Sequence, residues 1–138
     1  MNRIDFQELA EIRIAEAEAL LAQAKYDGAY YLAGYAVECA LKACIARQTN
    51  QHDFPPKPES VRKYYSHKID EFLDTTGLKP MRNATASTDA NFNANWLTAT
   101  EWSEQSRYDR KSRADAEDLI AAITDANHGV LPWIKRYW

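Results

Sequence analysis

The sequence predicts an all-α fold, in which one domain over residues 1–138 forms a mostly antiparallel, up-and-down bundle of four or five helices. Three observations lead to this prediction. The chain has only four glycines and five prolines, so its segments run long before a helix breaker interrupts them. Apolar residues recur at helical spacing in several segments, and none alternates apolar and polar residues long enough to predict a strand. A length of 138 residues suits a single hydrophobic core.

Two long helices are predicted in the N-terminal third of the chain. The first runs from about Ile4 to Lys25, where apolar residues gather near one face between alanines and helix-tolerant charges. The second runs from about Ala29 to Gln48, after a break at Asp27-Gly28. Its apolar residues lie on nearly every side, which is typical of a central helix that several neighbours cover.

The middle of the chain is predicted to be less regular. Clustered prolines place residues 50–60 in a loop, because proline cannot continue a helix. A short helix should follow from about Val61 to Asp74 and end at Thr75-Thr76-Gly77. Residues 77–92 are rich in Asn, Thr and Ser, so we expect them to form a long surface loop.

Two further helices are predicted in the C-terminal third. One should start near Asn93 and continue towards Arg107-Tyr108, and the final helix should start near Arg113. Gly129 and Pro132 should kink or interrupt the final helix before the aromatic C-terminal segment.

Charge and hydropathy exclude several classes of protein. The net charge of −3 provides no overall basic field for nucleic acid, so a nucleic-acid surface would have to be local. No apolar run is long enough to span a membrane, and the charged N-terminal segment lacks the apolar stretch of a signal peptide. We therefore expect a cytoplasmic protein without membrane association.

Metal and cofactor motifs are missing from the sequence. Cys39 and Cys44 lie five residues apart in one predicted helix, on different sides of it, so we expect two buried thiols rather than a disulfide. The three histidines show no metal-ligand spacing, and the chain has no glycine-rich phosphate loop, serine nucleophile elbow or HExxH zinc helix. We therefore expect neither a metal nor a cofactor.

Two arginine–histidine pairs could supply ribonuclease chemistry. Arg47 precedes His52, and Arg62 precedes His67, by five residues in each pair. An arginine can hold a phosphate while an imidazole moves a proton, and these two groups suffice to cleave RNA through its own 2′-hydroxyl. Such pairs also arise by chance among 17 basic residues, so a helix end for Arg47 and a surface helix for Arg62 are the simpler interpretation.

The densest basic segment is the sequence RYDRKSR at residues 107–113, which we call the basic turn. On a loop between two helices, its four positive charges could clamp phosphates while its tyrosine stacks on a base. The simpler interpretation is a solvated turn between helices. The candidate ligand-binding residues are Arg107, Tyr108, Arg110, Lys111 and Arg113.

A charged pair interrupts the otherwise apolar central helix. Glu38 and Lys42 are four residues apart, in the favourable order for a helical ion pair, and Gly34 lies one turn earlier. On the surface such a pair would contribute only about 0.3–0.5 kcal/mol, too little to explain its position. Either this strip of the helix reaches water, or the pair meets charges from another helix, with Arg107 as the candidate partner of Glu38.

The stretch AYYLAGYAVECALKACIARQ resembles the central helix of the HEPN domain superfamily, in which an aromatic and alanine-rich run leads into a Glu-x-x-x-Lys pair. The order of the later elements is similar to that of prokaryotic members: His67-Lys68-Ile69-Asp70, Trp102, Arg107-Tyr108 and Ala114-Asp115-Ala116-Glu117. The resemblance implies an all-α fold, a homodimer, and association with a nucleotide, RNA or a nucleotidyltransferase partner.

Many members of this superfamily are ribonucleases in which an arginine and a later histidine, separated by four to six residues, lie near the start of a late helix. Arg107 matches that arginine by position, but positions 112–114 hold Ser112, Arg113 and Ala114, so the histidine is missing. The sequence therefore predicts a dimeric HEPN-like module that binds a nucleotide, RNA or a partner protein. The alternative is a metal-independent ribonuclease, similar to the toxin of a toxin–antitoxin pair, that uses one of the two arginine–histidine pairs.

Overall fold

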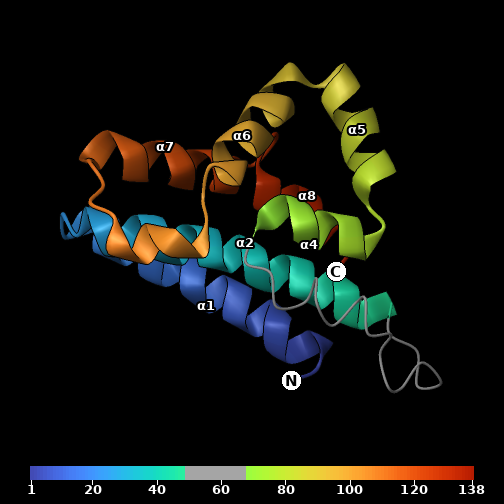
Figure 1. The fold of residues 1–138 in the computed structure, drawn as a ribbon, viewed down its shortest axis with the longest axis horizontal. Coiled ribbons are helices and arrows are strands. Elements are labelled where there is room, and N and C mark those ends of the chain that lie inside the picture. The colour runs from blue at the N-terminus through green and yellow to red at the C-terminus, as the bar shows by residue number, and fades with distance from the viewer. Residues whose placement is uncertain (49–67) are drawn as a thin grey trace.

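The computed structural model describes residues 1–48 and 68–138, and every regular element in these two ranges is helical. The predicted all-α class is therefore confirmed. The long helices α1 (Arg3–Ala22) and α2 (Tyr26–Gln48) run antiparallel along one side of the molecule, and the shorter helices lie over α2 (Figure 1). The described ranges contain seven α-helices and one 3-10 helix, more than the four or five helices predicted.

Helix α2 is the central element, as its all-round apolar pattern predicted. It packs against α1, α4 (Ile69–Thr76), α7 (Arg113–Thr124) and α8 (Val130–Lys135). Its many alanines allow neighbours to approach closely on several sides, and more than half of its residues are buried. Burial raises the pKa of Cys39 to about 11 and that of Cys44 to about 12, so both thiols are protonated at neutral pH.

The corner between α1 and α2 is tighter than predicted. Helix α1 ends at Ala22 instead of Lys25, and α2 begins at Tyr26 instead of Ala29. Ala24 adopts a left-handed conformation with φ +57°, and the Lys25 N–H donates to the Leu20 carbonyl at 2.9 Å, which closes the end of α1. The chain reverses direction within three residues.

The loop predicted over residues 77–92 is wrong, because most of this segment is helical. It contains α5 (Lys79–Thr88) and the start of α6 (Ala90–Thr100). Pro80 lies in the first turn of α5, where its missing N–H costs no helical hydrogen bond, and Asp89 caps α6 by accepting from the Phe92 N–H at 2.9 Å. No residue of α5 is buried, because the helix lies away from α1 and α2 (Figure 1). A helix that buries no face can be polar throughout, and its sequence then has the composition of a loop.

The single helix predicted from Asn93 to Tyr108 is two elements. Helix α6 ends at Thr100, and the short 3-10 helix η1 (Glu104–Tyr108) follows after a break. Ser103 and Ser106 form reciprocal capping hydrogen bonds at the start of η1, so the backbone is recapped there instead of continuing as one α-helix.

The last helix starts at Arg113, as predicted, and is interrupted before Gly129. Ser112 and Asp115 form a capping box at its first turn. Helix α7 ends at Thr124, and α8 begins at Val130. The predicted interruption is confirmed at residues 125–129, whereas Pro132, which was predicted to contribute to it, lies inside the first turn of α8.

The part of the predicted Val61–Asp74 helix that the structure describes is α4, which ends before Gly77. Gly77 has φ +73°, a left-handed conformation that glycine adopts without strain, so the predicted helix end is confirmed. The predicted loop at residues 50–60 and the start of the predicted helix, residues 61–67, lie outside the described residues.

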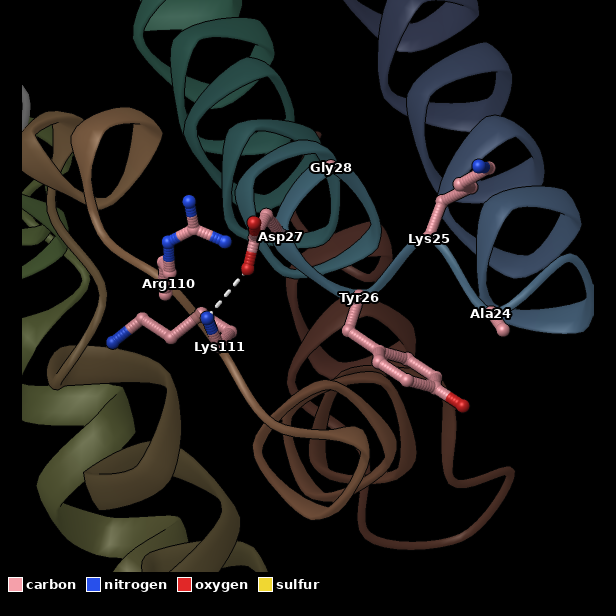
Figure 2. A pocket seen from close by; sticks show the side chains of 7 residues that line it. All are labelled: Ala24, Lys25, Tyr26, Asp27, Gly28, Arg110 and Lys111. Carbon is pink, nitrogen blue, oxygen red and sulfur yellow. Dashed lines mark hydrogen bonds between the residues drawn. The ribbon is translucent and has the colours of Figure 1, made fainter.

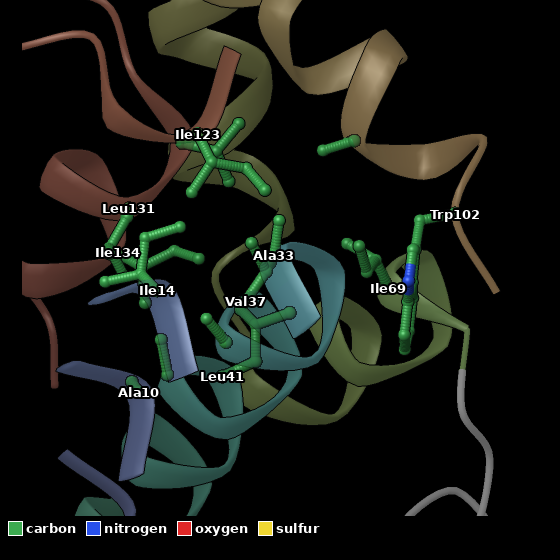
Figure 3. Packing of buried hydrophobic residues seen from close by; sticks show 14 of the residues in the cluster. Ala10, Ile14, Ala33, Val37, Leu41, Ile69, Trp102, Ile123, Leu131 and Ile134 are labelled. Atoms are coloured by element: carbon green, nitrogen blue, oxygen red, sulfur yellow. The ribbon is translucent and has the colours of Figure 1, made fainter. Parts of the chain in front are cut away.

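The core surrounds α2 on two sides. On one side, Val37 and Leu41 of α2 meet side chains from α1, α7 and α8, including Ile14 and Ile134 (Figure 3). On another side, the buried ring of Trp102 lies directly over Gly34, where a built Cβ atom would overlap the indole. This contact fixes the chain just before η1, and therefore fixes the segment that leads into the basic turn.

Candidate functional site

The basic turn runs from the last two residues of η1 to the first residue of α7 and is held against the first turn of α2. The backbone N–H of Lys111 donates to Asp27 Oδ1 at 2.5 Å. The Lys111 ammonium lies 4.4 Å from the centroid of the Tyr30 ring, within the range of a cation–π contact. These two contacts bring the basic turn, which is distant in sequence, against the α1–α2 corner.

Arg110 and Lys111 line an open cavity of about 380 Å³ together with residues of the α1–α2 corner, and in Figure 2 the ammonium groups of Lys111 and Lys25 point away from each other. We call it the corner cavity. Its lining residues are Ala24, Lys25, Tyr26, Asp27, Gly28, Arg110 and Lys111. The Ala29 N–H donates to the Lys25 carbonyl at 3.0 Å, which is the first helical hydrogen bond of α2. The backbone N–H groups of residues 26–28 therefore lack acceptors within α2, and they belong to residues that line the cavity.

Most positive charges of the basic turn already have carboxylate partners. Arg107 Nη2 lies 3.0 Å from Glu104 Oε1, and Arg113 Nε lies 2.6 Å from Glu117 Oε1. Lys111 Nζ is 4.0 Å from Asp109 Oδ2. In the two described ranges Arg110 forms no ion pair, so it is the arginine of the basic turn whose charge is most available to a ligand.

Tyr108 is the exposed aromatic residue of the basic turn. Its side chain is 71% exposed, and the Arg107 guanidinium lies 5.0 Å from its ring centroid. One guanidinium–aromatic contact is therefore already present at this ring. The other face of such a ring can stack on a planar ligand.

Comparison with family models identifies the fold to which these elements belong. The HEPN domain model matches residues 5–135. The chain belongs to the HEPN domain family. The match covers nearly the whole chain, which confirms the resemblance inferred from the central helix and the order of the later elements. Searches of curated proteins and of solved structures found no match.

In this HEPN domain, Glu38 and Lys42 pair with each other. Lys42 Nζ lies 2.9 Å from Glu38 Oε1, and the two side chains are 15% and 1% exposed. The Lys42 ammonium also lies 5.5 Å from the centroid of the Phe72 ring. The strip does not reach water, because Glu38 is buried and Trp102 covers Gly34. Among the described residues the carboxylate partner of Arg107 is Glu104, so the predicted Arg107–Glu38 pair is wrong.

Three of the four residues in the two arginine–histidine pairs lie outside the described residues. This applies to His52, Arg62 and His67. Arg47 is described, and its Nη1 donates to the Tyr137 carbonyl at 3.2 Å. The ribonuclease roles of these residues therefore stay predictions.

The described residues offer no metal centre and no membrane span. Within residues 1–48 and 68–138, no three His, Cys, Asp or Glu side chains gather closely enough to hold a metal ion. In the same ranges, no helix has both the length and the apolar character that crossing a bilayer requires.

Sequence reasoning missed an ion pair between His128 and Asp89. His128 Nδ1 lies 2.7 Å from Asp89 Oδ2, and the His128 backbone N–H donates to Asp125 Oδ1 at 2.7 Å. The hydrogen bond to Asp89 raises the pKa of His128 above its ordinary value of 6.5, and the same bond lowers the pKa of Asp89. The pair links the α5–α6 junction to the connection between α7 and α8. No local sequence signal reveals it, because 39 residues separate the partners.

The His128–Asp89 pair predicts a specific pH dependence of stability. Because folding raises the pKa of His128, its contribution is complete below the unfolded pKa of 6.5 and is lost as the pH rises through the folded pKa. We expect His128→Gln to lower the urea midpoint more at about pH 6 than at about pH 8. The wild-type midpoint, measured in parallel, accounts for the other histidines. An equal loss at both pH values would contradict the assignment.

Proposed function

We propose that this HEPN domain is a non-catalytic module that binds a phosphate-bearing ligand, a nucleotide or RNA, at the corner cavity. The observation that carries the proposal is the juxtaposition of the first turn of α2 with the basic turn. Residues 26–28, whose backbone N–H groups lack acceptors within α2, line the same cavity as the basic residues Lys25, Arg110 and Lys111. Backbone N–H groups at a helix start, together with cationic side chains, are the groups that bind phosphate in many proteins.

The charge balance of the cavity favours a ligand with few phosphates. The Asp27 carboxylate also lines the cavity, where it accepts from the Lys111 N–H, and it offsets part of the positive charge. Arg107 and Arg113 are held by their own carboxylates, which leaves Arg110 as the guanidinium best able to form a bidentate contact. A long polyanion needs a wide positive track, whereas a single phosphate or a short phosphate chain needs only this local set of donors.

The absence of catalysis is supported by the residues that follow Arg107. Where the ribonucleases of the family carry a histidine, this chain has Ser112, Arg113 and Ala114. Ser112 caps α7 by accepting from the Asp115 N–H at 3.1 Å, and Arg113 pairs with Glu117. None of these three side chains can exchange a proton at neutral pH as an imidazole does.

Arg110→Ala is expected to weaken ligand binding about tenfold, because it removes the arginine of the basic turn that has no ion-pair partner among the described residues. The measurement is fluorescence anisotropy with a labelled, 5′-phosphorylated RNA dodecamer, in competition with ATP. The slope of log affinity against log salt should fall by about one. Arg107→Ala should weaken binding less, since Glu104 already holds that guanidinium.

The matched control is Arg136→Ala, which removes an exposed arginine after α8. Equal effects of Arg110→Ala and Arg136→Ala would show that only net charge matters and would contradict the choice of surface. All incubations contain EDTA, and the RNA is examined on a gel afterwards. Cleavage of the RNA that disappears in His52→Ala or His67→Ala would favour the ribonuclease alternative.

The other properties implied by family membership stay predictions that accompany this proposal. They are a homodimer and a nucleotidyltransferase partner. The cytoplasmic location expected from charge and hydropathy, and the toxin role that belongs to the ribonuclease alternative, also stay predictions. Light scattering of the purified chain tests the homodimer.

A further inference from the structure

We infer that the outward face of α1 is a docking surface for a protein helix that carries basic residues beside apolar ones. Helix α1 has two apolar stripes instead of one. The buried stripe packs on the core through Phe6, Ala10, Ile14 and Ala17. The second stripe is exposed and consists of Ile4, Ile12, Ala15, Ala19 and Ala22. At about 3.6 residues per turn, its members fall on the side of α1 opposite the core.

The exposed stripe is unusual for the outward side of a surface helix, which is normally polar. Ile4 is 61% exposed and Ile12 is 48% exposed. The three alanines of the stripe are exposed as well, so the backbone of α1 is accessible to a close neighbour. Small residues that follow larger apolar ones along this side allow a second helix to pack closely on the C-terminal half of α1.

The charges next to this stripe are acidic. Glu8 lies within the stripe, between Ile4 and Ile12, and Glu11 and Glu18 lie along one of its edges. Glu11 is paired with Lys135 of α8, whereas Glu8 and Glu18 form no ion pair within the described part of the chain. The basic side chains of α1 are engaged elsewhere, since Arg13 Nη1 lies 2.6 Å from Glu16 and Arg3 donates to the Trp138 carbonyl at 2.6 Å.

A groove lies next to the exposed stripe and could hold an apolar side chain of a partner. A cavity of about 300 Å³ lies between α1 and the α7–α8 region, with Ile14 and Leu131 contributing buried apolar side chains. The remaining lining residues are Glu11, Ala15, Glu18, Thr124, Pro132 and Lys135. Ala15 belongs to both the stripe and the groove, so the two form one continuous surface. An apolar side chain of a partner can occupy the groove while a neighbouring lysine or arginine meets Glu18.

The charge of this surface distinguishes among its potential occupants. Nucleic acid is disfavoured, because phosphates would meet Glu8 and Glu18 without a free cation on the face. A second copy that pairs α1 with α1 is also disfavoured, because two acidic faces would oppose each other. A helix with basic residues beside an apolar stripe satisfies both the shape and the charge of the surface.

Two synthetic helical peptides test this inference with the intact chain. Both carry Leu and Ala at the same three- and four-residue spacing, flanked by Lys in one peptide and by Glu in the other. We expect fluorescence anisotropy to show binding of the Lys peptide only. Ile12→Ser should weaken this binding at least fivefold, whereas Leu97→Ser, which changes an exposed leucine of α6, should leave it unchanged.

Charge reversal provides the sharper test. Glu8→Lys combined with Glu18→Lys should abolish binding of the Lys peptide and create binding of the Glu peptide, because the apolar contacts are retained. Circular dichroism checks that each variant is folded. Equal binding of both peptides by the wild-type chain, or equal losses in the Ile12 and Leu97 variants, would overturn the inference. Light scattering that shows a wild-type dimer lost in Ile12→Ser would overturn it in favour of a second copy.

Discussion

Replacing Gly34 with alanine is expected to lower the free energy of unfolding by about 3 kcal/mol, the upper end of the usual cost of overpacking a core. The new Cβ atom would overlap the five-membered part of the Trp102 indole ring. The ring is buried and sits between α2 and the chain that leads into η1, so it cannot swing aside without leaving the core. For a domain of this size, such a loss corresponds to a fall in melting temperature of about 10 °C or more, measurable by circular dichroism.

Two further variants separate this overlap from a general effect of alanine. Trp102→Ala leaves a cavity and is itself destabilising, but adding Gly34→Ala to it should cost little, because the Cβ then has space. Gly28→Ala is the control, since its Cβ would meet only Leu20 Cδ1, at 3.2 Å, and should change stability by less than about 1 kcal/mol. Additive losses in the Gly34–Trp102 double variant would contradict the proposed contact.

The Gly34–Trp102 contact also connects stability to the candidate site. Trp102 precedes η1, and η1 leads directly into the basic turn, which the Lys111–Asp27 hydrogen bond fastens to α2. If the indole is displaced, Arg110 no longer faces the start of α2. If the Gly34→Ala chain still folds at low temperature, it should therefore bind phosphate ligands more weakly than the wild-type chain does, although every residue that lines the cavity is unchanged.

The parts of the fold that the sequence predicted well are those with a strong apolar pattern. Helices α1, α2 and α7 each bury a face, so apolar spacing located them to within a few residues. Helix α5 buries nothing, and a method based on apolar spacing therefore took it for a loop. Two local signals were present all the same, since Pro80 suits a first turn and Asp89 suits an N-cap.

The candidate site was predictable in its composition but not in its electrostatics. The basic turn stands out in the sequence, yet its charges are reduced by Glu104 and Glu117, which lie at helical spacing from Arg107 and Arg113. Both pairs lie inside helices that the sequence predicted, so their spacing was visible, but the contacts themselves appear only in the structure. The corner cavity was not predictable. It forms where the Lys111–Asp27 hydrogen bond brings the basic turn against the start of α2, and these two residues are 84 positions apart in the sequence.

Lys42→Met is expected to destabilise the HEPN domain by about 3–5 kcal/mol, because it removes the cation from a buried ion pair and leaves the carboxylate behind. The Glu38 side chain is 1% exposed, and its Oε1 accepts from Lys42 Nζ at 2.9 Å. Water cannot replace the ammonium at that depth. The methionine keeps a similar length and packs on Phe72, so the loss reports the charge and not a cavity. Urea unfolding measures the effect.

A double-mutant cycle and an exposed pair in the same chain complete this experiment. Glu38→Met combined with Lys42→Met removes both buried charges and should be less destabilising than Lys42→Met alone, with a coupling energy of about 2 kcal/mol or more.

Arg113 and Glu117 form a closer pair, at 2.6 Å, but both side chains are exposed. Water can solvate Glu117 once its partner is gone, so Arg113→Met should leave the urea midpoint nearly unchanged. If the two single variants had similar effects, burial would not be what makes the Glu38–Lys42 pair strong.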